Sequence, residues 1–235
     1  MNLGATCQSI QSPLRLTIMA ALARTVLVVE DEDFLRSLIA DSLESQGFKV
    51  ATAANALDAK RLISSIDPDA AVLDIELGSG PTGLDLAAQL AITSPEIGIV
   101  FLTDLPDPRF ARDHHEVKKN QAYLNKGLLA DSTVLSEAIN AVLLEEGVED
   151  FRHDQKEDRP LAQLSRIQLE ILKLVVAGKT NQQIAEIRQR SIGATESAIT
   201  RTLEALGIPK DADVNVRVEA VRSYFEAVTP YGRRR

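Results

Sequence analysis

The sequence predicts an α/β fold, in which a doubly wound five-stranded parallel sheet is followed by a small all-α domain. Three observations support this prediction. Between residues 25 and 146, short apolar runs rich in β-branched residues alternate with segments of helical periodicity. The loops between them are short, as in sheets whose strands are joined by crossover helices. After residue 160 the strand-like runs stop, and four short amphipathic helices follow in close succession.

The composition is that of a globular protein, with 45% hydrophobic residues in 235. No apolar run reaches the roughly 18 residues of a membrane span, so we expect a cytoplasmic protein. Cys7 is the one cysteine, which excludes an internal disulfide and fits a reducing compartment. Residues 1–150 hold 11 Lys/Arg against 23 Asp/Glu, whereas residues 151–235 hold 15 against 11. This asymmetry predicts two modules with different partners.

The elements of the first module follow in order after an N-terminal extension, residues 1–24, that we expect to be flexible. Apolar, β-branched runs predict strands at 25–29, 48–53, 70–77, 97–104 and 121–127. Apolar residues at helical spacing predict helices at 33–47, 56–66, 82–92 and 132–144. Residues 105–121 are polar and contain two prolines, so we expect a helix there to be short, displaced or mobile.

Polar residues stand where these strands end. Carboxyl, hydroxyl and amino groups follow the first, third, fourth and fifth strands, at Glu30, Asp31, Asp74, Glu76, Thr103 and Lys126. Four consecutive acids alone usually mean a solvated loop. Here the carboxyl ends of parallel strands meet at one edge, so these groups are expected to gather. Neighbouring carboxylates resist full ionisation unless a cation lies among them, and oxygen ligands favour Mg²⁺. A carboxylate that accepts a phosphoryl group needs these parts around it.

Residues 25–146, the first domain, resemble the receiver domain of two-component response regulators, whose fold is flavodoxin-like. The resemblance rests on an acidic pair, an Asp, a Thr and a Lys that follow one another in this order. The separations are 43 residues from Asp31 to Asp74, 29 from Asp74 to Thr103 and 23 from Thr103 to Lys126. It implies that a sensor histidine kinase phosphorylates Asp74 and that Thr103 and Lys126 bind the phosphoryl oxygens. It further implies a Mg²⁺ site formed by Asp31, Asp74 and the Glu76 carbonyl, with Glu30 acting through water. Tyr123 would be the aromatic switch residue and would move when Thr103 moves.

One residue departs from that family pattern. A small residue usually follows the switch threonine, whereas this chain has Asp104. A carboxylate there adds negative charge near an incoming phosphate. We therefore expect Asp104 to slow phosphorylation or to change which donor is accepted.

Residues 147–160 are charged and end on Pro160, so they are predicted to be a linker. Helices are then predicted at 164–178, 180–190, 191–207 and 214–228, the first two with Ser/Thr–Gln capping boxes. The tight turn between the second and third helices predicts a helix-turn-helix domain over residues 161–229, before a basic tail, residues 230–235.

This second domain resembles the LuxR/NarL-type DNA-binding domain, most clearly from Leu164 to Ala185. The resemblance implies that the third helix enters a major groove. Its predicted outward face carries Glu196 and Glu204 and few cations, which predicts weak DNA binding unless other residues compensate. The candidate DNA-contacting residues are Arg201, Thr200, Ser197, Thr195, Lys179, Asn181, Arg188 and Arg190.

Together these features predict a response regulator in which phosphorylation of Asp74 controls DNA binding and transcription, with a homodimer forming on phosphorylation. We expect no enzymatic activity beyond acceptance of the phosphoryl group and no membrane association. The sequence leaves two alternatives. The second domain could bind a protein rather than DNA, as the acidic face of its third helix favours. The receiver could also work without phosphate, although its intact acidic pocket argues against this.

Overall fold

The computed structural model describes most of the chain, namely residues 23–112, 115–128, 131, 133–157, 161–208 and 215–228. Nearly all of the predicted N-terminal extension and all of the basic tail lie outside these residues. Among the described helices, none has the length and apolarity that a membrane crossing requires.

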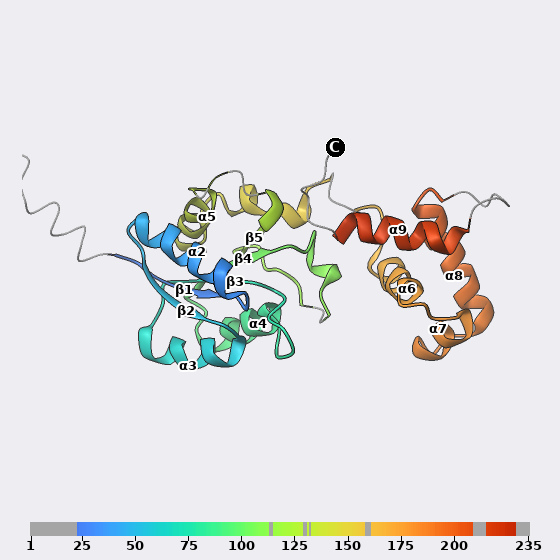
Figure 1. Ribbon diagram of the computed structural model, residues 1–235, viewed down its shortest axis with the longest axis horizontal. Helices are drawn as coiled ribbons and strands as arrows, with labels where there is room; N and C mark the ends of the chain where they lie inside the picture. Colours follow the sequence, from blue (N-terminus) through green and yellow to red (C-terminus); the bar gives the residue numbers. More distant parts are fainter. Residues whose placement is uncertain are drawn as a thin grey trace, which may run out of the picture.

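A five-stranded, all-parallel sheet forms the centre of the first domain, as the sequence predicts (Figure 1). Its strands are β1 (Thr25–Val29), β2 (Lys49–Ala53), β3 (Ala70–Leu73), β4 (Gly98–Thr103) and β5 (Ala122–Asn125). Their spatial order is β2-β1-β3-β4-β5. The chain therefore leaves β1 toward one side and later continues from β3 toward the other, so β1 and β3 flank the switch point where such sheets bind ligands.

Helices cover both faces of the sheet because alternate strand residues point to opposite sides. Helices α2 (Asp33–Ser45) and α5 (Thr133–Leu144) share one buried apolar cluster with Val26, Val28 and Val72. Helices α3 (Ala56–Ile66) and α4 (Gly83–Thr93) belong to the cluster of the other face. The result is the three-layer arrangement that the alternation of strands and helices predicts.

The connection from β4 to β5 lacks an α-helix in its described residues. It contains the 3-10 turn η1 (Pro108–Phe110) and otherwise irregular chain. Proline removes a backbone N–H and disfavours helix in the residue before it, so Pro106 and Pro108 account for this local structure. A second 3-10 turn, η2 (Lys126–Leu128), begins directly after β5.

Much of the predicted linker is packed against the sheet rather than free. The turns η3 (Val148–Phe151) and η4 (His153–Gln155) lie along the outer edge of β5. The Nδ1 atom of His153 accepts a hydrogen bond from the backbone of Asn125 at 3.1 Å. Arg152 and Asp154 are both buried and pair at 2.8 Å. Because these two charges neutralise each other, the segment predicted to be a charged linker can cover the outer edge of β5.

The second domain consists of α6 (Arg166–Val176), α7 (Asn181–Ile187), α8 (Ile192–Ala205) and α9 (Val216–Val228). Both predicted capping boxes are present, Ser165 with Gln168 and Thr180 with Gln183. Helix α6 is central, since it packs against both α8 and α9. In Figure 1, α6 and α9 lie nearer the receiver-like domain, while α8 lies at the far end.

The start of α4 is tied closely to the strand end that carries Asp74. The backbone N–H of Gly83 donates to Ile75 O at 3.0 Å. A Cβ atom at Gly83 would lie 2.0 Å from the backbone oxygen of Asp74. Helix α4 can therefore approach the candidate site this closely only with glycine at this position.

We predict that Gly83→Ala lowers the free energy of unfolding by about 1–3 kcal/mol, because the added methyl group forces α4 away from the strand. Urea denaturation measures the change. Gly193→Ala is the matched control, since a Cβ there meets no atom within 4 Å. Equal effects of the two substitutions would contradict the packing argument.

Candidate functional site

The acidic residues come together because of the register of the sheet. Val29 lies opposite both Ala53 and Leu73. Glu30 follows Val29 and Asp74 follows Leu73, so these two residues leave the sheet side by side. Two backbone hydrogen bonds continue the ladders past the strand ends, from Glu30 N to Ala53 O at 3.1 Å and from Asp74 N to Val29 O at 2.9 Å. The backbone therefore fixes both carboxylates at the carboxyl edge.

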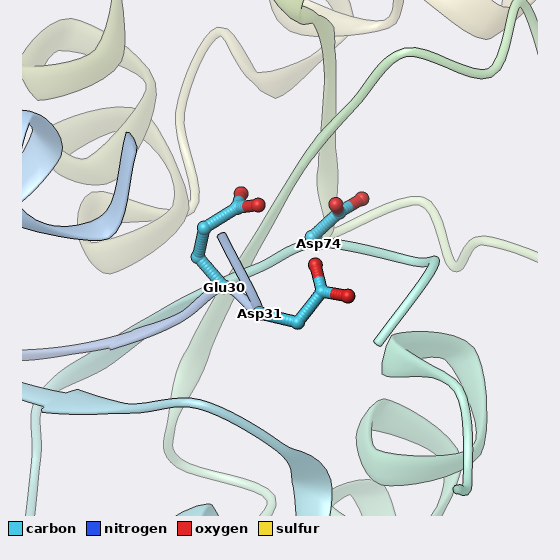
Figure 2. Close-up of side chains that lie close together, drawn as sticks. All are labelled: Glu30, Asp31 and Asp74. Atoms are coloured by element: carbon cyan, nitrogen blue, oxygen red, sulfur yellow. The ribbon is translucent and has the colours of Figure 1, made fainter. Parts of the chain in front are cut away.

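Three carboxylates form one cluster at this edge. Figure 2 shows the side chains of Glu30, Asp31 and Asp74 gathered where β1 and β3 end. One oxygen atom from each lies within 4.8 Å of the others. Glu30 and Asp74 are buried, whereas Asp31 is exposed. Like charges this close strongly favour a bound cation.

Lys126 supplies a positive charge to the two buried carboxylates. Its Nζ atom donates to Glu30 Oε2 at 2.7 Å and to Asp74 Oδ2 at 2.9 Å. Burial disfavours the ammonium, but Asp74 and the hydrogen bond to Glu30 outweigh this effect, so the pKa of Lys126 is raised. Burial also raises the pKa of Glu30, because the hydrogen bond from Lys126 only partly offsets the lost hydration.

The three carboxylates suit a magnesium ion by their chemistry. The cluster offers oxygen atoms only, which Mg²⁺ prefers to nitrogen or sulfur. Mg²⁺ also keeps several of its water ligands, and the exposed Asp31 is open to solvent. These residues therefore fit the ion that the sequence predicts.

Thr103, at the end of β4, and Tyr123, in β5, are both buried. The Thr103 Oγ1 atom accepts a hydrogen bond from Leu105 N at 3.4 Å. The Tyr123 hydroxyl donates to Leu105 O at 2.9 Å, and burial raises the pKa of this phenol well above its usual value. The ring of the predicted switch residue is thus already inside the domain, and both side chains are linked to Leu105.

Two further acids border the cluster. The backbone N–H of Glu76 donates to Asp74 Oδ1 at 3.3 Å, and burial raises the pKa of its own carboxyl group. Asp104 is exposed, and partial desolvation raises its pKa, with Asp74 adding to the effect and Lys126 opposing it. The roles predicted for the Glu76 carbonyl and for the Asp104 side chain remain predictions.

The candidate DNA-contacting residues are divided by the structure. Ser197 and Arg201 are exposed on α8, and Thr200 is half-buried. The outward placement predicted for Thr195 is wrong, because its side chain is fully buried. Thr195, Ile199 and Thr202 are the buried residues of α8, so two threonines and one isoleucine form the inner stripe of this helix.

The remaining candidates surround the helix-turn-helix unit. Arg190 is exposed, whereas Arg188 is half-buried and lies 3.9 Å from Glu170. Arg217 on α9 donates to the Lys179 carbonyl at 3.0 Å and to Asn181 Oδ1 at 2.5 Å. The Asn181 side chain is therefore engaged within the domain.

Sequence reasoning missed two arginines of the β4–β5 connection. Arg112 donates to Gly78 O at 2.8 Å, in the loop that follows Asp74. The Arg109 guanidinium reaches the second domain, where it donates to Leu161 O at 3.3 Å. No motif or spacing marks these residues, because their partners are backbone carbonyls distant in sequence.

Comparisons with known proteins agree with this geometry. Residues 26–146 match the family described as "Response regulator receiver domain". The oxygen regulatory protein NreC of Staphylococcus aureus is 29% identical, over 68% of this chain and 79% of that protein.

Two solved structures of RcsB share the two-domain fold. One, from Salmonella enterica serovar Typhimurium, covers 85% of this chain and 98% of that chain, at TM-score 0.53 and 18% identity. Another, titled as two RcsB dimers bound to two parallel DNAs, covers 88% of this chain and 100% of that chain, at TM-score 0.53 and 19% identity. These likenesses support the fold of both domains.

We predict that Glu30→Gln raises the free energy of unfolding of the metal-free protein at pH 7. Because the pKa of Glu30 is raised on folding, its contribution to stability is full below the unfolded-state pKa and is lost as the pH rises through the folded-state pKa. The neutral glutamine avoids this loss, so its advantage should disappear at acidic pH, where the wild-type carboxyl is protonated.

Urea denaturation at several pH values measures this difference. Glu44→Gln, which alters an exposed carboxylate on α2, is the control and should change stability little at any pH. A Glu30→Gln variant that is less stable than wild type at pH 7 would contradict the prediction.

Proposed function

Since the chain belongs to the response regulator family, with a receiver domain over about half its length, we propose that Asp74 accepts a phosphoryl group from a sensor histidine kinase. We further propose that this modification controls DNA binding by the second domain and thereby transcription. One observation carries the proposal: the Lys126 ammonium joins the buried Glu30 and Asp74 carboxylates at the switch point of the sheet.

The proposed chemistry is a direct displacement at phosphorus. A carboxylate oxygen of Asp74 forms the new P–O bond, and the P–N bond to the kinase imidazole breaks with its electrons remaining on the leaving nitrogen. The Lys126 ammonium and the Thr103 hydroxyl donate hydrogen bonds to the phosphoryl oxygens. Lys126 then exchanges its present carboxylate partners for a phosphoryl oxygen without leaving the cluster.

Asp31, Asp74 and the Glu76 carbonyl would hold Mg²⁺, with Glu30 acting through water. When bound, the ion neutralises negative charge on the phosphoryl oxygens and on the carboxylates. Asp104 remains a candidate brake, because its carboxylate stands near Asp74. Since the product is a modified regulator rather than a released compound, the chain is not an enzyme in the usual sense.

The proposal for DNA rests on the second domain. Helix α8 follows the α6–α7 pair and exposes Ser197 and Arg201, as a recognition helix does. RcsB, which shares this fold, is described in its structure titles as bound to DNA. Because Glu196 and Glu204 are exposed on the same helix, we assign phosphate contacts to cations outside it, namely Lys179, Arg188 and Arg190. A cytoplasmic location and a homodimer formed on phosphorylation complete the proposal.

We predict that the wild-type protein gains one phosphoryl group from a small phosphodonor, and only when Mg²⁺ is present. Asp74→Asn should gain none, because an amide oxygen is a poor nucleophile for this step. Intact mass spectrometry measures the transfer. An Asp74→Asn variant that gains the group as fast as wild type would contradict the assignment.

We also predict that Arg201→Ala weakens specific DNA binding by 1–3 kcal/mol, about fivefold to more than a hundredfold, through the loss of a base-reading contact. Gel shifts with genomic fragments at fixed salt measure this change. Arg222→Ala is the control, since Arg222 pairs with Glu219 and Glu226 on α9. A phosphorylated wild type that binds no fragment even at low salt would favour a protein partner instead.

A further inference from the structure

The loop that follows Asp74 is anchored in the first domain on both sides of an exposed turn. Leu77, near the start of the loop, is buried in the apolar core. At the end of the loop, Thr82 is buried and begins α4 through a capping box with Asp85. Residues 78–80 between them are exposed, and we call them the Gly78–Gly80 turn. Its two glycines have more conformational freedom than other residues, so the turn depends on contacts from elsewhere to stay in one place.

Arg112, in the β4–β5 connection, supplies such a contact. Its guanidinium donates to Gly78 O at 2.8 Å and to Gly80 O at 3.5 Å. Among the side chains that the structure describes, Arg112 alone donates to these two carbonyls. Because a guanidinium is rigid and planar, one group bound to two carbonyls restrains the distance between them as well as their position.

The same connection contacts the far end of the loop. The Nε2 atom of His115 lies 2.9 Å from Asp85 Oδ1, in the capping box that begins α4. Arg112 and His115 are three residues apart, so a short stretch of the connection reaches from the Gly78–Gly80 turn to the start of the helix. The hydrogen bonds of Arg112 are therefore part of a wider contact between two segments that are distant in sequence.

The Gly78–Gly80 turn borders the carboxylate cluster. Gly78 has a φ of 72°, which glycine adopts without strain. A Cβ atom on Gly78 would lie 3.6 Å from Asp31 Oδ2. Glu76, whose carbonyl is a proposed ligand of Mg²⁺, precedes Gly78 by two residues. The turn is therefore next to two of the proposed ligands, one through space and one along the chain.

We propose that Arg112 is a positioning residue for the magnesium site. By holding the Gly78–Gly80 turn, it keeps the Glu76 carbonyl and the backbone beside Asp31 in place before the cation arrives. Groups that hold metal ligands from outside the coordination sphere raise the affinity, since less conformational freedom is lost when the ion binds. The inference rests on the proposed function of the cluster and adds to it a residue that does not touch the ion.

The charge of Arg112 separates this role from a purely electrostatic one. Burial and the Asp74 charge raise the pKa of the Glu76 carboxyl group, and the Arg112 charge opposes them, so the guanidinium acts on the site. A positive charge at this position repels Mg²⁺. Its removal should tighten Mg²⁺ binding if Arg112 acts by charge alone, and should weaken binding if Arg112 holds the turn. The two roles therefore predict changes of opposite sign.

The test measures Mg²⁺ binding to the full chain by calorimetry at fixed ionic strength. We expect Arg112→Gln to bind Mg²⁺ about tenfold more weakly than wild type, the lower end of what loss of an outer-shell partner costs. Arg112→Lys keeps the charge but not the planar fork, so its affinity should lie between those two. Arg61→Gln is the control, because it removes the same charge from an exposed site on α3 and should bind as wild type does.

Hydrogen exchange of the metal-free protein gives a second readout. Peptides that cover residues 76–80 should exchange faster in Arg112→Gln than in wild type or Arg61→Gln. Peptides that cover β1 and β3 should exchange at the wild-type rate, which separates a loosened turn from a loosened fold.

An Arg112→Gln variant that binds Mg²⁺ as tightly as wild type, or more tightly, would overturn the positioning role. Unchanged exchange in residues 76–80 would overturn it as well. A wild-type protein that binds no Mg²⁺ would instead refute the metal site of the proposed function. Because Arg112 is exposed, both of its variants should fold, and circular dichroism checks this.

Discussion

The ion pairs of Lys126 with Glu30 and Asp74 are the interaction on which the rest of the structure depends. Two carboxylates at adjacent strand ends repel each other, and burial removes the water that would screen them. One ammonium at 2.7 and 2.9 Å makes the arrangement stable. Removing the Lys126 ammonium would leave two neighbouring buried carboxylates without a counter-charge, at a cost of about 3–5 kcal/mol.

This constraint extends outward through short connections. Gly83 lets α4 approach the strand that carries Asp74. Thr103 and Tyr123 both bind Leu105, which begins the segment on which the second domain docks. Only a few hydrogen-bonded contacts therefore separate the carboxylates at the strand ends from the helix-turn-helix domain. The described part of the connection between β4 and β5 makes these contacts with irregular chain that contains two prolines rather than with an α-helix.

Sequence reasoning recovered what short-range patterns encode. Buried runs gave the strands, and the order of polar residues after them located Glu30, Asp74 and Lys126, because parallel strands end at one edge. Capping boxes located the starts of α6 and α7. The packed segment at 148–155 was missed, since its charges cancel only in three dimensions. Thr195 was misplaced because a threonine can fill an inner position that an apolar pattern does not mark.

A crystal structure with Mg²⁺ and beryllofluoride would show whether the carboxylate cluster binds a phosphoryl group. We expect beryllofluoride on a carboxylate oxygen of Asp74, within hydrogen-bond distance of Lys126 Nζ and Thr103 Oγ1. We also expect the cation between Asp31 and Asp74. Beryllofluoride bound elsewhere, or a Lys126 side chain turned away into solvent, would show that the cluster does not act as proposed.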